Sequence, residues 1–285
     1  MTEKVTWADG SVYEGEIENG KLTGKGKVTS ADGEVYEGDF VDSAYHGKGK
    51  KTFADGSVYE GDWDDNLPHG KGKFTTADGY TYEGDWVDGK STGKGKSSLA
   101  DGSVYEGDFV ENVFHGKGKM TWNMGDIYEG DWEDDKQHGK GKFTRFNGAV
   151  YEGDFVTNWF QGKGKMTWAD GSVYEGDWDG GNRHGKGKMT WKDDDGVVMI
   201  YEGDFADNQF HGKGKMTWTD DGTFYEGDFV EGTRQGKGKM VWADGRVYVG
   251  DWSDGMRNGK GKMTYADGKV EEGDWKDGEF VGKEE

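Results

Sequence analysis

The chain has 285 residues, of which 57 are acidic and 36 are basic, and its formal net charge of −21 disfavours nucleic acid and other polyanionic partners. Hydrophobic residues make up only 31%, too few for an ordinary two-layer core, yet the aromatic content of 14% is too rich for a disordered chain. The 54 glycines disfavour helices, because each costs about 1 kcal/mol in a helix interior, so the composition predicts strands and turns.

A 23-residue repeat covers the chain, which begins in mid-repeat. Tyr-Glu-Gly first occurs at Tyr13 and recurs every 23 residues, except for steps of 27 and 24 residues after Tyr174 and Tyr201. Gly-Lys-Gly follows 11 residues after each start, and the last copies diverge at Tyr248 and Glu271. We therefore predict one continuous array of about 12 repeats over residues 1–285, with no linker and no second domain.

Each unit contains two predicted strands. Residues 162–168 alternate with period two, placing glycine, Met166 and Trp168 on one face and lysine and threonine on the other. Residues 173–178 alternate likewise, with Tyr174 and Trp178 on the glycine-bearing face and valine and acidic residues opposite. We call the first surface the aromatic face and the second the charged face, on which acidic residues of one strand should stand near lysines of the next.

The loop between these strands follows from the rule that directly opposed residues share a face. A two-residue turn would pair Trp168 with Val173 and mix the faces. A three-residue Ala169-Asp170-Gly171 loop pairs Met166 with Tyr174 and puts glycine at the left-handed bulge position. We predict an all-β fold: an elongated, single-layer antiparallel sheet of tandem 23-residue β-hairpins, forming a curved or twisted ribbon with an aromatic groove, where glycine makes room for overlying rings.

Tyr-Glu-Gly-Asp-Trp followed by His-Gly-Lys-Gly-Lys-Met-Thr-Trp-Ala-Asp-Gly-Ser closely resembles the MORN (membrane occupation and recognition nexus) repeat, over essentially the whole chain. The resemblance implies elongated curved sheets without catalysis of their own, acting as scaffolds at cytoskeletal, flagellar or membrane-contact structures. Some members bind partner helices, and phospholipid binding has been proposed for the family. The sequence departs from the pattern at Glu271, in place of tyrosine, and at Arg145, in place of an aromatic residue.

The resemblance and the open face of a single-layer sheet together predict a groove that binds a protein segment, in the manner of a helix or peptide. The residues expected to line this groove are Tyr151, Met166, Trp168, Tyr174, Trp178, Trp191 and Trp218. We expect a non-enzymatic scaffold without cofactor or metal, because the candidate acids and bases recur identically in every unit, whereas a catalytic site is singular.

A second candidate surface comes from a coupling between two repeat positions. Four of the five units with phenylalanine in place of the strand-ending tryptophan carry an aromatic residue five positions later, as Phe155 does with Phe160. Either the later ring fills the volume missing beside the smaller phenylalanine, or these rings form an exposed edge that anchors a partner. The candidate edge residues are Tyr45, Phe114, Trp159, Phe160 and Phe210.

All six histidines occupy one repeat position, immediately before Gly-Lys-Gly, as at His115 and His138. Adjacent repeats should lie about 9.6 Å apart, too far for two imidazoles to share a zinc ion at about 2.0–2.1 Å. We therefore expect a structural, hydrogen-bonding role at the turn, and a metal held across a dimer interface is the alternative.

The alternative function is recognition of a phospholipid or membrane surface, which the resemblance suggests and the net charge of −21 disfavours. Exposed strand edges predict a homodimer or end-to-end association. The chain has no cysteine, which is typical of a reducing compartment, so we expect a cytoplasmic protein associated with the cytoskeleton or a membrane.

Overall fold

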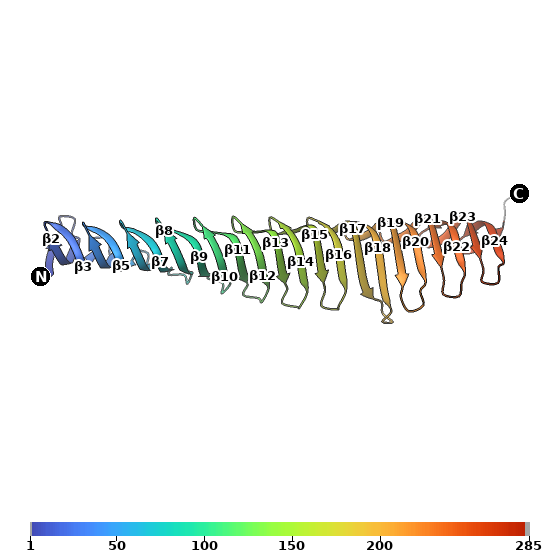
Figure 1. The fold of residues 1–285 in the computed structure, drawn as a ribbon, viewed down its shortest axis with the longest axis horizontal. Coiled ribbons are helices and arrows are strands. Elements are labelled where there is room, and N and C mark those ends of the chain that lie inside the picture. The colour runs from blue at the N-terminus through green and yellow to red at the C-terminus, as the bar shows by residue number, and fades with distance from the viewer. Residues whose placement is uncertain (1, 283–285) are drawn as a thin grey trace. The chain divides into compact units, whose positions relative to one another are not determined.

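The computed structural model describes residues 2–282, which consist of β-strands joined by turns (Figure 1). The chain divides into two compact units, Met1–Gly139 and Lys140–Glu285, and the boundary falls within β13 (Lys136–Thr144). In the described part of the chain, no helix is long and apolar enough to cross a membrane. The predicted all-β class is confirmed.

The strands of both units are short and closely spaced. Those of the first unit are β1 (Thr2–Thr6), β2 (Val12–Glu18), β3 (Lys21–Thr29), β4 (Val35–Val41), β5 (Ala44–Thr52), β6 (Val58–Asp64), β7 (Leu67–Thr75), β8 (Thr81–Val87), β9 (Lys90–Ser98), β10 (Val104–Val110), β11 (Val113–Thr121) and β12 (Ile127–Glu133). Those of the second are β14 (Val150–Val156), β15 (Trp159–Thr167), β16 (Val173–Asp179), β17 (Asn182–Lys192), β18 (Val198–Ala206), β19 (Gln209–Trp218), β20 (Phe224–Val230), β21 (Thr233–Val241), β22 (Val247–Ser253), β23 (Met256–Thr264), β24 (Val270–Lys276) and β25 (Glu279–Gly282).

Within each unit, consecutive strands pair antiparallel and follow chain order in a single layer (Figure 1). The predicted loop is confirmed: Met166 opposes Tyr174, Thr167 opposes Val173, and Gly171 has a φ of 86°. The loop is closed by a 2.9 Å hydrogen bond from the Trp168 N–H to the Ser172 carbonyl. This geometry is the three-residue hairpin with a left-handed glycine.

The other hairpin of each repeat has a two-residue turn with two left-handed residues. Between β6 and β7, Asp65 has a φ of 44° and Asn66 a φ of 68°, as a type I′ turn requires. Asn66 Oδ1 also accepts a 2.9 Å hydrogen bond from the Tyr45 N–H, which lies in the preceding hairpin. Aspartate, asparagine and glycine recur at these turns because they tolerate this conformation.

The core lies within the aromatic face of each unit. The tyrosine of Tyr-Glu-Gly is at most 1% exposed wherever it occurs, from Tyr13 to Tyr225, and Tyr248 of the divergent copy is 0% exposed. The aromatic residue one position before the end of the same strand is also buried, as Phe40 and Trp63 show. Each sheet therefore buries rings against its own backbone, because its aromatic face has no second layer of strands.

Candidate functional site

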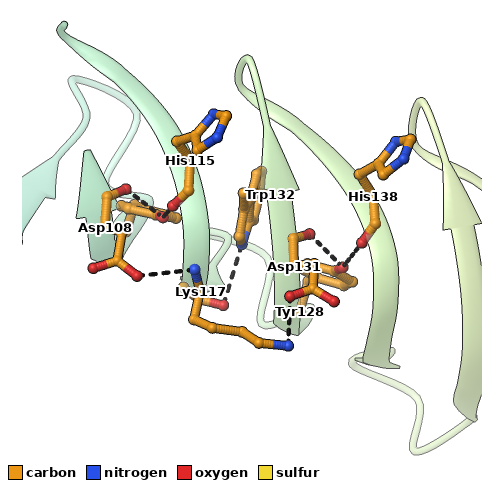
Figure 2. Close-up of polar contacts among 9 residues, drawn as sticks. Asp108, His115, Lys117, Tyr128, Asp131, Trp132 and His138 are labelled. Atoms are coloured by element: carbon orange, nitrogen blue, oxygen red, sulfur yellow. Dashed lines mark hydrogen bonds and ion pairs between the residues drawn. The ribbon is translucent and has the colours of Figure 1, made fainter. Parts of the chain in front are cut away.

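A β-bulge recurs along the chain, and an aspartate closes it in the repeats that Figure 2 shows, whereas the first repeat has Glu16 at this position. The pairing of β10 with β11 shifts register between Gly107 and Asp108, and Gly116 in the bulge has a φ of 63°. Asp108 Oδ2 accepts a 3.0 Å hydrogen bond from the Lys117 backbone N–H. The first glycine of Gly-Lys-Gly is thus needed for a left-handed backbone conformation, which residues with a Cβ rarely adopt.

The tyrosine of each repeat lies against a pair of glycines in adjacent strands. A Cβ added to Gly176 would lie 2.5 Å from Tyr174 Oη, and one added to Gly187 would lie 2.5 Å from Tyr174 Cε2. Tyr174 Oη donates a 2.8 Å hydrogen bond to the Asp177 carbonyl, and burial raises the pKa of this hydroxyl. The expectation that glycine makes room for a ring is confirmed, and the ring belongs to the same repeat.

Tryptophans link the tyrosines of neighbouring repeats into a ladder. The Trp132 ring meets Tyr105 at 5.3 Å and Tyr128 at 5.1 Å between centroids, both edge to face. Trp132 Nε1 donates a 3.1 Å hydrogen bond to the Gly118 carbonyl (Figure 2). Such aromatic pairs contribute about 0.5–1.5 kcal/mol beyond their buried area, so this ladder couples each repeat to the next.

The residues predicted to line the groove fall into two groups. Tyr151 and Tyr174 are 0% exposed, and Met166 and Trp178 are 5% exposed, so these four are covered by the protein itself. The other three, which lie at or just before the loop that joins the two strands, are partly exposed: Trp168, Trp191 and Trp218. A partner that docks without rearrangement can therefore touch only the second group.

Four of the predicted edge residues pack over the core. Tyr45, Phe114, Phe160 and Phe210 each stack on the tyrosine of their own repeat, with centroids 3.7 to 4.0 Å apart. We call their place in the repeat the covering position. The volume-filling explanation of the coupling is supported, since each covering ring also meets the adjacent phenylalanine at about 5.5 Å. Trp159 differs: it opposes Val156 on the charged face and is 62% exposed.

In three of the repeats that lack a ring at the covering position, an arginine occupies it: Arg183, Arg234 and Arg257. The Arg234 guanidinium lies 4.8 Å from the Trp252 ring and 5.7 Å from Tyr225, a cation–π arrangement. Burial lowers the pKa of each of these arginines from its ordinary value. The sequence analysis did not predict this role, although the alternation of arginine with aromatic residues at one repeat position was the available signal.

The charged face carries the predicted cross-strand ion pairs. Lys213 Nζ lies 2.5 Å from Asp228, and Lys188 Nζ lies 2.6 Å from Glu202. Exposed pairs of this kind contribute about 0–1 kcal/mol, so they set register more than stability. In the second unit this face also forms a hollow of about 1230 Å³, on the opposite side of the sheet from the predicted aromatic groove.

The histidines lie beside the bulge in a strand, not within the turn. His115 opposes Asp108, and His46 Nδ1 lies 3.2 Å from the Asp64 carboxylate of the adjacent strand. Among residues 2–282, no three His, Cys, Asp or Glu side chains are grouped so that they could hold a metal ion. The Nδ1 atoms of His69 and His115 are buried without a hydrogen-bond partner, so the expected hydrogen-bonding role is not seen at these two residues.

We expect acid to weaken the array through the bulge aspartates. A hydrogen bond from the Lys71 ammonium, 2.5 Å away, lowers the pKa of Asp85 against the opposing effect of burial, and the Lys94 N–H contributes in the same direction. A carboxylate whose pKa is lowered by folding stabilises the folded chain above its ordinary pKa of about 3.9, and this contribution is lost as pH falls through the folded value. Asp39, Asp62, Asp108, Asp177, Asp204 and Asp228 also have lowered pKa values.

Urea unfolding at about pH 7, 5 and 3 measures this effect, and Asp85→Asn is the matched control. The variant should lose about 0.2–1 kcal/mol at neutral pH, the usual range for an exposed ion pair. It should also show a smaller fall between pH 5 and 3, because one titrating carboxylate is absent. An acid sensitivity identical to that of the parent would contradict this role for Asp85.

Comparisons with known proteins agree with the repeat architecture. The family model for the MORN repeat matches twelve segments, at residues 13–35, 36–58, 59–79, 82–104, 105–127, 128–150, 151–173, 174–196, 201–223, 225–245, 248–270 and 272–283. A search of curated proteins finds no significant match.

Two solved structures align over most of the chain, but with little structural similarity. One is the SAS-4 (dCPAP) TCP domain of Drosophila melanogaster in complex with a proline-rich motif of Ana2 (dSTIL), and the other is a streptogramin B lyase. Each alignment has 12% identity, covers 96% of this chain and 90% or 83% of the other, and gives a TM-score of 0.16. A score this low shows nothing about fold or function.

Proposed function

The chain belongs to the MORN repeat family, and from that premise we propose that it is a non-enzymatic scaffold whose aromatic face binds a helical segment of a partner protein. The family is one of protein-interaction or membrane-associated modules. The observation that carries the proposal is the partly exposed row formed by Trp168, Trp191 and Trp218. Large aromatic residues in such positions provide most of the binding energy in protein interfaces.

The spacing of the repeats favours a helix as the bound segment. Adjacent repeats are two strands apart, about 9.6 Å at 4.8 Å per strand, while seven residues of α-helix advance about 10.5 Å. A helix that crosses the strands can therefore present one apolar residue per heptad to each repeat. The covering residues Phe160 and Phe210 and the tryptophan row would form its contact surface, since all are partly exposed.

A displayed library of 20-residue peptides tests the proposal. Peptides selected on the parent protein should carry apolar residues at i, i+3, i+4 and i+7. The double variant Trp168→Ala/Trp218→Ala should weaken their binding at least about tenfold, the effect of losing about 1.4 kcal/mol. Trp159→Ala is the control, because that exposed ring is on the charged face. Equal binding by parent and double variant would rule out this face, and loss with Trp159→Ala alone would transfer the site to the charged face.

Flotation with liposomes separates this proposal from recognition of a membrane surface. Neutral, phosphatidylserine and phosphoinositide vesicles are compared at physiological salt. We expect the protein to remain at the bottom of the gradient, because a net charge of −21 opposes approach to an anionic surface. Comigration with one lipid that resists added salt would favour the membrane function instead.

A further inference from the structure

The charged face of the second unit carries a regular ladder of lysine and glutamate. The glutamate of Tyr-Glu-Gly lies between lysines of the two adjacent strands: Glu226 opposes both Lys215 and Lys239. In this arrangement each carboxylate can interact with two ammonium groups, and the row is close to neutral. A missing carboxylate therefore leaves positive charge at a defined place.

Val249 interrupts this ladder. It occupies the glutamate position, lies between Lys239 and Lys262, and is 53% exposed. Lys262 Nζ lies 3.5 Å from Glu272 on its other side. Lys239 keeps one glutamate opposite it, Glu226, and its Nζ is 5.9 Å from the centre of the Phe224 ring. Lys239 and Lys262 thus each oppose one glutamate, Glu226 and Glu272, whereas Lys215 opposes two, Glu202 and Glu226.

The interruption lies in the hollow of the charged face. Its wall includes the three lysines, both flanking glutamates and Val249, and its floor is formed by backbone at glycines such as Gly238 and Gly250. At about 1230 Å³ it has room for several residues of an extended peptide. Exposed valine between two ammonium groups suits a ligand with a carboxylate beside an apolar side chain.

We propose that this hollow binds an acidic segment of a partner protein, with one Asp or Glu carboxylate above Val249 between Lys239 and Lys262. The bound carboxylate completes the ladder that the other repeats complete with their own glutamate. A nucleic acid fits less well, because its closely spaced phosphates would also meet Glu226 and Glu272. This site is on the opposite side of the sheet from the tryptophan row, so the proposal stands whether or not the aromatic face binds a helix.

A fluorescein-labelled peptide of alternating glutamate and valine is the probe, and fluorescence anisotropy at low salt measures its binding. The parent protein should bind this peptide and not its glutamine and valine counterpart. Val249→Glu should weaken binding about fivefold, because the new carboxylate occupies the place between the two lysines and repels the carboxylates of the probe at close range. Val249→Gln, of similar size and without charge, should bind within about twofold of the parent.

Thermal unfolding shows whether Val249→Glu is folded, and its midpoint should not fall, because the new carboxylate has two lysine neighbours. Lys239→Gln is the second variant, and it should weaken binding of the probe as well, since it removes one of the two ammonium groups that flank Val249. Absence of binding by the parent overturns the proposal. So does equal binding by parent, Val249→Glu and Lys239→Gln, or binding of the glutamine peptide at the same strength.

Discussion

Gly176→Ala is expected to lower the free energy of unfolding by about 3 kcal/mol or more, the upper part of the range for overpacked cores. The added Cβ would lie 2.5 Å from Tyr174 Oη, 2.6 Å from the Gly187 Cα and 2.6 Å from the Lys186 carbonyl oxygen. Two of these atoms belong to the backbone of the paired strand, so they cannot move away without loss of the strand pairing. Denaturant unfolding measures the effect.

Gly171→Ala is the matched control, because it separates steric overlap from the general effect of replacing glycine. Gly171 has a φ of 86°, and a Cβ there would meet no heavy atom within 4 Å. Its replacement should cost only the backbone strain of a left-handed alanine, about 1–2 kcal/mol. Equal losses of unfolding free energy in Gly176→Ala and Gly171→Ala would show that close packing against tyrosine is not the reason for glycine at position 176.

Tyr174→Ala is expected to lower the free energy of unfolding by about 3–5 kcal/mol, as for other buried aromatic side chains. The ring is 0% exposed and meets Trp178 at 5.1 Å and Phe205 at 4.9 Å between centroids. Its loss would leave a cavity above the glycine pair and remove the link between two repeats. Calorimetry and denaturant unfolding would report both the lost stability and any change in cooperativity.

Tyr174→Phe provides the comparison, because it keeps the ring and removes only the hydroxyl that bonds the Asp177 carbonyl at 2.8 Å. That change should cost about 0.5–1.5 kcal/mol. In an array where each repeat contacts only its neighbours, Tyr174→Ala should also divide the unfolding transition into two, since coupling across this repeat is weakened. A single sharp transition with a loss no larger than that of Tyr174→Phe would contradict the ladder.

The hairpins could be predicted from the sequence because they are local. The requirement that opposed residues share a face decided the loop at Gly171 and the pairing of Met166 with Tyr174, and both are confirmed. The bulge was not predicted. The first glycine of Gly-Lys-Gly marks the bulge. From the sequence alone, however, a glycine needed for a left-handed conformation looks the same as a glycine that makes room for a ring. The register shift between Gly176 and Asp177 in the structure distinguishes the two.

The candidate site was predicted less completely than the fold. Period-two alternation assigned Tyr174 and Trp168 to one face correctly, but it could not distinguish the buried tyrosine from the partly exposed tryptophan. That difference depends on contacts with adjacent repeats. The same holds for Arg183, which covers Tyr174 from a position where aromatic residues occur in other repeats.

The sequence by itself determined the repeat, the two-strand unit and the register of the three-residue hairpin, because these depend on residues close together in the chain. Only the tertiary structure decided which side chains a partner can reach. In the structure the tyrosines are buried against their glycine pairs, and the hollow of the second unit lies on the charged face. Exposure is set by how neighbouring strands pack and bend, and a period-two pattern carries no information about either.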